Sequence, residues 1–118
     1  MNYDAEKLLT QWGRWVWQGA GVPVYVSPSY ALMRDNVEQL YLPAAAITDD
    51  EAMMIDRMVA VMGRRDEIMA NCVRLYYCTN RTMEQVGKVM QLSRLKVREL
   101  LIAGKTYVEA CLDMRAAA

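Results

Sequence analysis

The most informative stretch of this 118-residue chain is residues 82–100, TMEQVGKVMQLSRLKVREL. Thr82 and Gln85 have the spacing of a capping box, which predicts that a short helix begins here. After a brief break, Ser93 has the position of an N-cap, and the pattern of a longer helix follows. A short helix, a tight turn and a long helix in this order predict a helix-turn-helix over residues 81–105.

The apolar and small residues of this stretch fit two helices that cross at a steep angle. Contacts between the two helices are expected from Val86, Met90, Leu92, Val97 and Leu100 or Leu101. Gly87 is the small residue that is needed where the second helix approaches the first. Gln91 stands at the turn position where glycine commonly takes a positive φ, so we expect a four-residue turn, which does not require that angle.

Basic residues are concentrated in the same part of the chain. The chain has no net charge, but the balance is −4 in residues 1–60 and +4 in residues 61–118. Between Arg81 and Lys105 there are six basic residues against two acidic ones. A basic face on a neutral protein predicts a polyanion as partner, and on a helix-turn-helix that partner is double-stranded DNA.

The candidate DNA-binding residues are Arg81, Ser93, Arg94, Lys96, Arg98 and Lys105. Arg94 and Arg98 are expected to contact bases, because an arginine can bind O6 and N7 of guanine with two hydrogen bonds. Lys96, Arg81 and Lys105 are expected to neutralise phosphates. The alternative is a three-helix packing unit whose charged face is merely solvated.

The rest of the chain predicts further helices. Asp4 can cap a helix with an apolar stripe, and Trp17 projects from the opposite side of that helix. A capping box at Thr48 begins a second helix, which Gly63 is expected to end. Asp66 is expected to cap a third helix. Its inward-facing residues are expected to be Ile68, Met69, Cys72, Val73, Leu75 and Tyr76.

Four methionines lie close together in the second of these helices: Met53, Met54, Met58 and Met62. Such a cluster suits either a pliable binding groove or the filling of a core, and the helical spacing favours the core.

Residues 19–47 lack a helical period and contain three prolines, which predicts an irregular loop with a functional or mobile role. The whole sequence therefore predicts an all-α protein. It is expected to be a single small helical domain over 1–118, with a C-terminal helix-turn-helix whose last helix is long and an irregular middle loop.

Composition excludes several classes of function. The chain contains no histidine, which removes the Ser/His/Asp and Cys/His catalytic groups and the commonest metal ligand. Three cysteines without a CxxC pair are expected to be ordinary buried thiols in a reducing compartment. We expect a cytoplasmic protein that is not an enzyme and has no cofactor, no metal, no membrane contact and no small-molecule substrate.

Four segments are distinctive in combination: LLTQWGRW (8–15), DDEAMMID (49–56), Tyr76-Tyr77 and GKTYVEACL (104–112). Together they resemble the Q antitermination proteins of lambdoid phages and prophages, in particular the small helical type rather than the zinc-containing type. The resemblance extends from about Tyr3 to Met114, with a poor match over 21–47.

The resemblance implies a phage late-gene transcription antiterminator in the bacterial host cytoplasm. Proteins of this kind bind a DNA element at the late promoter and load onto RNA polymerase held in a sigma-dependent pause. They then narrow the RNA exit channel around the nascent RNA, so that terminators are read through. The resemblance assigns DNA reading to Arg94, Lys96 and Arg98 and a mostly structural role to the WGRW motif at 12–15. Contact with the polymerase or the RNA channel is expected from Trp17, Tyr25 and Tyr30.

Two alternatives share parts of this interpretation. A helix-turn-helix repressor or activator acting at initiation would use the same DNA face but would leave terminator readthrough unaltered. A protein-only interaction module would retain its activity after Arg94 and Arg98 are replaced together by alanine.

Overall fold

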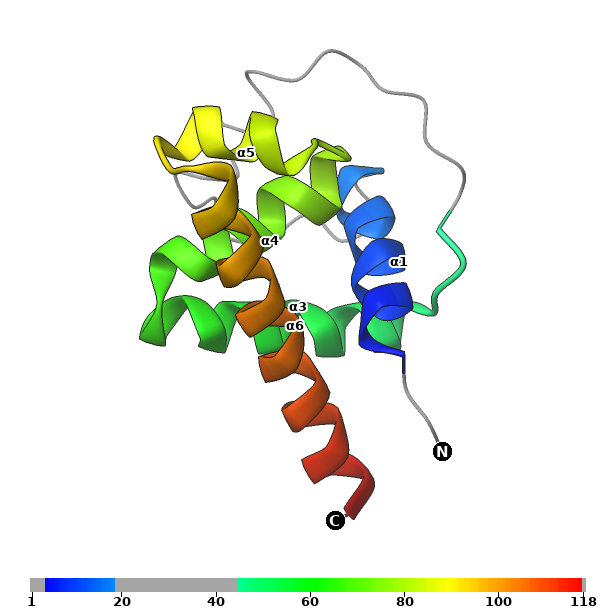
Figure 1. The fold of residues 1–118 in the computed structure, drawn as a ribbon. Helices are drawn as coiled ribbons and strands as arrows, with labels where there is room; N and C mark the ends of the chain where they lie inside the picture. The colour runs from blue at the N-terminus through cyan, green and yellow to red at the C-terminus, as the bar shows by residue number, and fades with distance from the viewer. Residues whose placement is uncertain (1–3, 19–44, 118) are drawn as a thin grey trace.

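A computed structural model of the chain describes residues 4–18 and 45–117, and these residues form five helices and no strand (Figure 1). The helices are α1 (Ala5–Trp17), α3 (Asp49–Arg65), α4 (Glu67–Thr79), α5 (Met83–Met90) and α6 (Arg94–Ala117). The prediction of an all-α protein with a long last helix is confirmed. Most of the predicted irregular loop, residues 19–44, lies outside the described residues.

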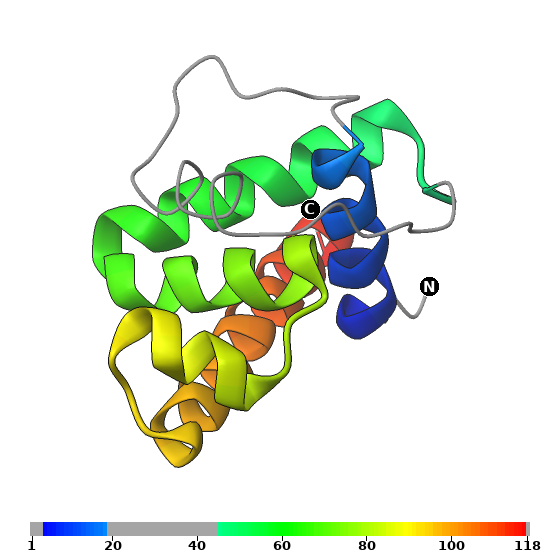
Figure 2. The same cartoon turned by 90° about the horizontal axis from the view of Figure 1, so that it is seen from above.

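The central helix is α4, which packs against α1, α3, α5 and α6. It follows α3 after a single connecting residue, Asp66, and the two helices lie side by side (Figure 2). The long helix α6 crosses both of them and also contacts α1. This arrangement leaves the α5–α6 turn at one end of the molecule and the end of α6 at the other (Figure 1).

The predicted helix starts are present. Asp4 accepts a hydrogen bond from the backbone N–H of Lys7 at 3.2 Å, and Thr48 forms a complete capping box with Glu51. Asp66 has an extended backbone and caps α4 by accepting from the N–H of Met69 at 3.0 Å. The same residue ends α3, because its own N–H donates to the carbonyl oxygen of Met62.

The prediction that Gly63 ends the second helix is wrong. Helix α3 continues through Gly63 to Arg65. A β-carbon on Gly63 would lie 3.4 Å from the β-carbon of Ala70, so this glycine lies where α3 and α4 approach each other. This glycine therefore lies inside the helix at the contact with α4 and does not reverse the chain.

The core is built from the predicted apolar stripes, and all five helices contribute to it. The fully buried large side chains include Leu9, Trp12, Ile55, Met62, Leu75, Val86, Val97, Val108 and Leu112. One expectation fails in α4, because Ile68 is 51% exposed while Tyr77 is buried instead. Helix α1 lies against the end of α4 that carries Tyr77, and Ile68 lies nine residues, or about 13 Å, before it.

The WGRW motif attaches α1 to its neighbours. The indole N–H of Trp12 donates to Asp56 at 3.3 Å, and that of Trp15 donates to Asp49 at 2.9 Å. Between them, a β-carbon on Gly13 would lie 2.0 Å from the carbonyl oxygen of Tyr77, so the backbones of α1 and α4 touch at this glycine. These contacts give the motif a structural role.

None of the described helices is both long enough and apolar enough to cross a membrane. Within residues 4–18 and 45–117, no group of three or more acidic or cysteine side chains is placed to hold a metal ion. Every buried polar side-chain atom in this part of the chain has a hydrogen-bond partner.

Candidate nucleic-acid interface

The interface begins with α5, whose start matches the sequence prediction. Thr82 accepts from the N–H of Gln85 at 3.1 Å, and the Gln85 side chain accepts from the N–H of Thr82 at 2.9 Å. Val86 is fully buried and anchors this short helix to the core. The capping box and one apolar anchor therefore fix the orientation of α5.

The turn between α5 and α6 differs from the expected four-residue form. Only three residues, 91–93, separate the two helices, and Gln91 has a left-handed backbone with φ 59° and ψ 44°. The expectation that a positive φ is not needed is therefore wrong. A shorter turn must reverse the chain more sharply, and the left-handed conformation of Gln91 provides this reversal.

Gly87 makes the short turn possible. Its carbonyl oxygen accepts hydrogen bonds from the N–H groups of both Gln91 and Leu92, the latter at 2.8 Å. A β-carbon on Gly87 would lie 2.6 Å from the carbonyl oxygen of Leu92. The close approach predicted for Gly87 is confirmed, and the same contact explains why alanine is absent from this position.

The first half of α6 is held to the core by every third or fourth residue. Ser93 caps the helix by accepting from the N–H of Lys96 at 3.1 Å, as predicted. Val97 and Leu101 are buried, and Gly104 is buried where a β-carbon would lie 2.6 Å from Cγ2 of Val73 in α4. These contacts fix which face of α6 is exposed.

The exposed face of α6 carries the candidate cations. Arg94, Lys96 and Arg98 are exposed, and Lys105 is half-buried. Among the described residues, no hydrogen bond or ion pair engages the side chain of any of these four. Leu95, which lies between two of them, is 63% exposed. The guanidinium and ammonium groups therefore have no hydrogen-bond or ion-pair partner among the described residues.

Helical geometry brings three of the four cations into one row. Arg94 and Arg98 are four residues apart and share one side of α6, and Lys105 continues the row two turns further on. Lys96 lies about 200° around the helix from Arg94, on the other flank. Lys105 is about 16 Å along the helix axis from Arg94, which exceeds the width of a major groove.

Arg81 is brought to the start of α6 by the connection between α4 and α5. Arg81 and Arg94 line one surface depression of about 740 Å³ between α1, α4 and the starts of α5 and α6. Two carboxylates, Glu6 and Glu84, line the same depression, and Glu6 accepts a hydrogen bond from the Tyr77 hydroxyl at 2.7 Å. The depression thus joins two predicted DNA-binding residues, but its charge is mixed.

Of the three residues predicted to contact the polymerase, Trp17 is the one within the described part of the chain, and it does not line this depression. Trp17 is half-buried at the end of α1, and Tyr25 and Tyr30 lie outside the described residues.

Two of the three thiols of the chain, Cys72 and Cys78, are poorly suited to nucleophilic chemistry. Cys72 and Cys78 are buried, as expected, whereas Cys111 is only partly buried. Burial raises the pKa of the Cys72 thiol to about 11, and it raises the pKa of Cys78 as well. Both groups are therefore neutral at physiological pH.

One of the three comparisons with known proteins identifies a family. A family model described as phage antitermination protein Q matches residues 2–118. No curated protein and no solved structure matches the chain. Because the family match extends over almost the entire chain, this helical protein belongs to the phage antitermination protein Q family and is a phage transcription antiterminator.

Proposed function

We propose that the protein binds duplex DNA through α5 and α6 and carries out antitermination from that site. The observation that supports this is the exposed cationic face at the start of α6, where Arg94, Lys96 and Arg98 have no partner among the described residues. The buried side of α6 is fixed by Val97 and Leu101, so the cations are presented by a rigid helix.

The cations divide into two roles in this proposal. Arg94 and Arg98 share one side of the first turns of α6 and enter the major groove, where each can bind a guanine. Lys105 lies too far along the helix for the same groove and contacts a phosphate of the flanking backbone. Lys96 on the other flank, and Arg81 with Ser93 beside the start of α6, also contact phosphates.

The DNA site would place the protein at a phage late promoter, next to RNA polymerase held in a sigma-dependent pause. The protein would then load onto the polymerase, narrow the RNA exit channel around the nascent RNA and allow terminators to be read through. Trp17, Tyr25 and Tyr30 are the residues that we propose for contact with the polymerase or the RNA channel.

The test begins with the selection of a binding site from random duplexes. The selected duplex is then placed at a promoter followed by a pause and an intrinsic terminator, and readthrough is measured in vitro. Arg94→Ala with Arg98→Ala should abolish both binding and readthrough, whereas Arg57→Ala with Arg115→Ala, on a distant surface, should retain DNA binding. A protein that alters initiation but not readthrough would be a promoter regulator. Full readthrough by the Arg94 and Arg98 variant would contradict the proposed DNA face.

Binding should also depend steeply on salt, because neutralising phosphates releases counterions from the duplex. An affinity that does not change between low and physiological ionic strength would contradict phosphate contacts.

A further inference from the structure

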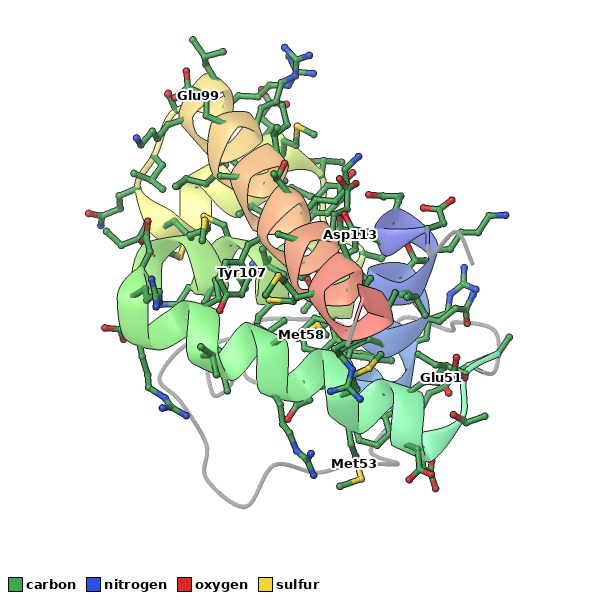
Figure 3. The ribbon with its side chains drawn as sticks, turned by 90° about the horizontal axis from the view of Figure 1, so that it is seen from below. Glu51, Met53, Met58, Glu99, Tyr107 and Asp113 are labelled. Carbon is green, nitrogen blue, oxygen red and sulfur yellow. The ribbon has the colours of Figure 1, made fainter. Side chains whose placement is uncertain are left out.

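A second surface lies on the α3 and α6 side of the molecule. Helices α3 and α6 enclose a groove of about 410 Å³, which we call the α3/α6 groove. Its lining is Asp50, Met53, Met54, Arg57, Met58, Val61, Tyr107, Cys111 and Arg115. Figure 3 looks onto this face, with Met58 and Tyr107 near the crossing of the two helices and Met53 on α3. None of the candidate DNA-binding residues lines it.

The floor of the groove is made of flexible apolar side chains. Met58 is buried, but Met53 is 46% exposed and Val61 is 37% exposed. The helical spacing favours a core role for the four methionines of α3. Met58 and Met62 are buried and take that role, but Met53 does not. Exposed methionines beside an aromatic ring form a surface that adapts to different apolar partners.

The rim of the groove is basic. Arg57 and Arg115 are exposed and line it, and Asp50 is the one acidic side chain in the lining. Burial and Cys111 raise the pKa of the Tyr107 hydroxyl, while the guanidinium groups of Arg64 and Arg65 act on it in the opposite direction. The two arginines of the lining outnumber its one carboxylate, which favours an occupant of negative charge.

We propose that the α3/α6 groove is a docking site for an acidic amphipathic helix of a protein partner. The apolar face of the partner helix would lie on Met53, Met58 and Tyr107. Its carboxylates would face Arg57 and Arg115. Grooves that bind helices combine an apolar floor with charged residues at the rim. In this rim the two arginines outnumber the single carboxylate of Asp50. This inference does not depend on DNA binding, because the two surfaces share no residue.

The probe is a pair of synthetic amphipathic peptides of about 18 residues, or five helical turns. Both carry the same leucine stripe at i, i+3, i+4 and i+7, but one has glutamates on its polar face and the other has lysines. We expect the glutamate peptide to bind the full-length protein at least about tenfold more tightly by fluorescence anisotropy. Equal affinities would mean that the surface only adsorbs apolar peptides, and would overturn the proposal.

The location of binding is read from Cys111, which lines the groove and is partly buried. The glutamate peptide should slow alkylation of Cys111 by N-ethylmaleimide, measured by mass spectrometry. The buried thiols Cys72 and Cys78 provide internal standards for the integrity of the fold. Binding without protection of Cys111 would place the peptide elsewhere and overturn the proposal.

Variants on the exposed surface then test the chemistry of docking. Arg57→Glu with Arg115→Glu should reverse the preference, so that the lysine peptide binds more tightly. Met53→Ala should weaken binding of the glutamate peptide several-fold. Ile68→Ala, at a similarly exposed position outside the groove, should leave that binding unchanged. Arg94→Ala with Arg98→Ala should leave peptide binding unchanged. Self-association that is lost in Met53→Ala would identify a second copy as the occupant and overturn the proposal.

Discussion

The backbones of Gly87 and Leu92 are in close contact across the turn between α5 and α6. The carbonyl oxygen of Gly87 accepts a hydrogen bond from the N–H of Leu92 at 2.8 Å, and the carbonyl oxygen of Leu92 occupies the space that a side chain at position 87 would need. Gly87→Ala should therefore lower the free energy of unfolding by about 1–3 kcal/mol, because the obstacle is backbone rather than a movable side chain. Urea denaturation measures this. Unchanged stability would mean that the turn can open without loss.

The left-handed backbone of Gln91 leads to the opposite prediction. A non-glycine residue in this conformation is strained by roughly 1 kcal/mol, which glycine avoids. Gln91→Gly should raise the free energy of unfolding by up to about 1 kcal/mol, after the greater chain entropy of glycine is subtracted. Gln91→Ala retains a β-carbon and should show no such gain in the same thermal or urea denaturation. A gain in the alanine variant would show that the side chain, not the backbone, is responsible.

Two glycines in helices should respond in opposite ways to alanine. Gly13→Ala places a β-carbon 2.0 Å from the Tyr77 carbonyl oxygen and should destabilise the protein by about 3 kcal/mol or more. Gly63→Ala places its β-carbon in ordinary contact with Ala70 at 3.4 Å. It should be neutral or should gain up to about 1 kcal/mol from helix propensity. Circular dichroism during urea denaturation compares the free energies of unfolding of the two variants. Equal losses of stability would argue against the close contact of α1 with α4.

Asp56 should make stability depend on pH in a particular direction. Burial raises the pKa of this carboxyl group, although the Trp12 hydrogen bond and Arg74 act to lower it. The folded protein therefore keeps this proton to a higher pH than the unfolded chain does. The contribution of Asp56 to stability falls as the pH rises from the ordinary value of 3.8 through the raised pKa.

Asp56→Asn should consequently be more stable than the natural protein at neutral pH, with the difference shrinking as the pH falls through the raised pKa towards 3.8. Urea denaturation across this pH range measures the difference. Glu109→Gln, at an exposed position, serves as the control and should show no such gain. A less stable Asp56→Asn variant at neutral pH would mean that the charge attraction of Arg74 outweighs burial.

The two roles proposed for the cations of α6 can be separated by salt and sequence dependence. Arg98→Ala should reduce discrimination at one base pair by about 1–3 kcal/mol. Lys105→Ala should weaken binding to all sequences alike and lower the magnitude of the salt slope by about one. Binding titrations on the selected duplex and its single-base variants test both, with Lys7→Ala on α1 as the control. Loss of sequence preference in the Lys105 variant would reverse the proposed assignment.

Much of the fold was accessible from local sequence chemistry. The caps at Asp4, Thr48, Asp66, Thr82 and Ser93 are short-range patterns, in which a side chain bonds to a backbone group three residues away. The buried stripes were accessible for the same reason, since one helical period determines which residues share a face.

The errors concern features that depend on neighbouring helices. Gly63 looks like a helix end, but α3 continues through it to Arg65 beside α4, which a local pattern does not reveal. Ile68 is exposed against expectation, whereas Tyr77 is buried, because α1 lies against the end of α4 that carries Tyr77. The positive φ of Gln91 follows from the length of the turn, which depends on how α6 meets α5.

The candidate sites could be predicted from the sequence to different degrees. The exposure of Arg94, Lys96 and Arg98 follows from the single buried position Val97 between them. The depression shared by Arg81 and Arg94 was not predicted, because it joins a loop to a helix thirteen residues later. The α3/α6 groove needs two helices that are distant in the sequence, so the methionine spacing alone favoured an ordinary core.

The position of α4 in contact with every other described helix has a dynamic consequence. No helix of this body can detach without uncovering α4, so partial opening should be rare and the five helices should melt together. Amide protons along α4 should then exchange with solvent only when the entire body opens. The two surfaces at the α5–α6 turn and at the α3/α6 groove would consequently keep a constant separation and orientation.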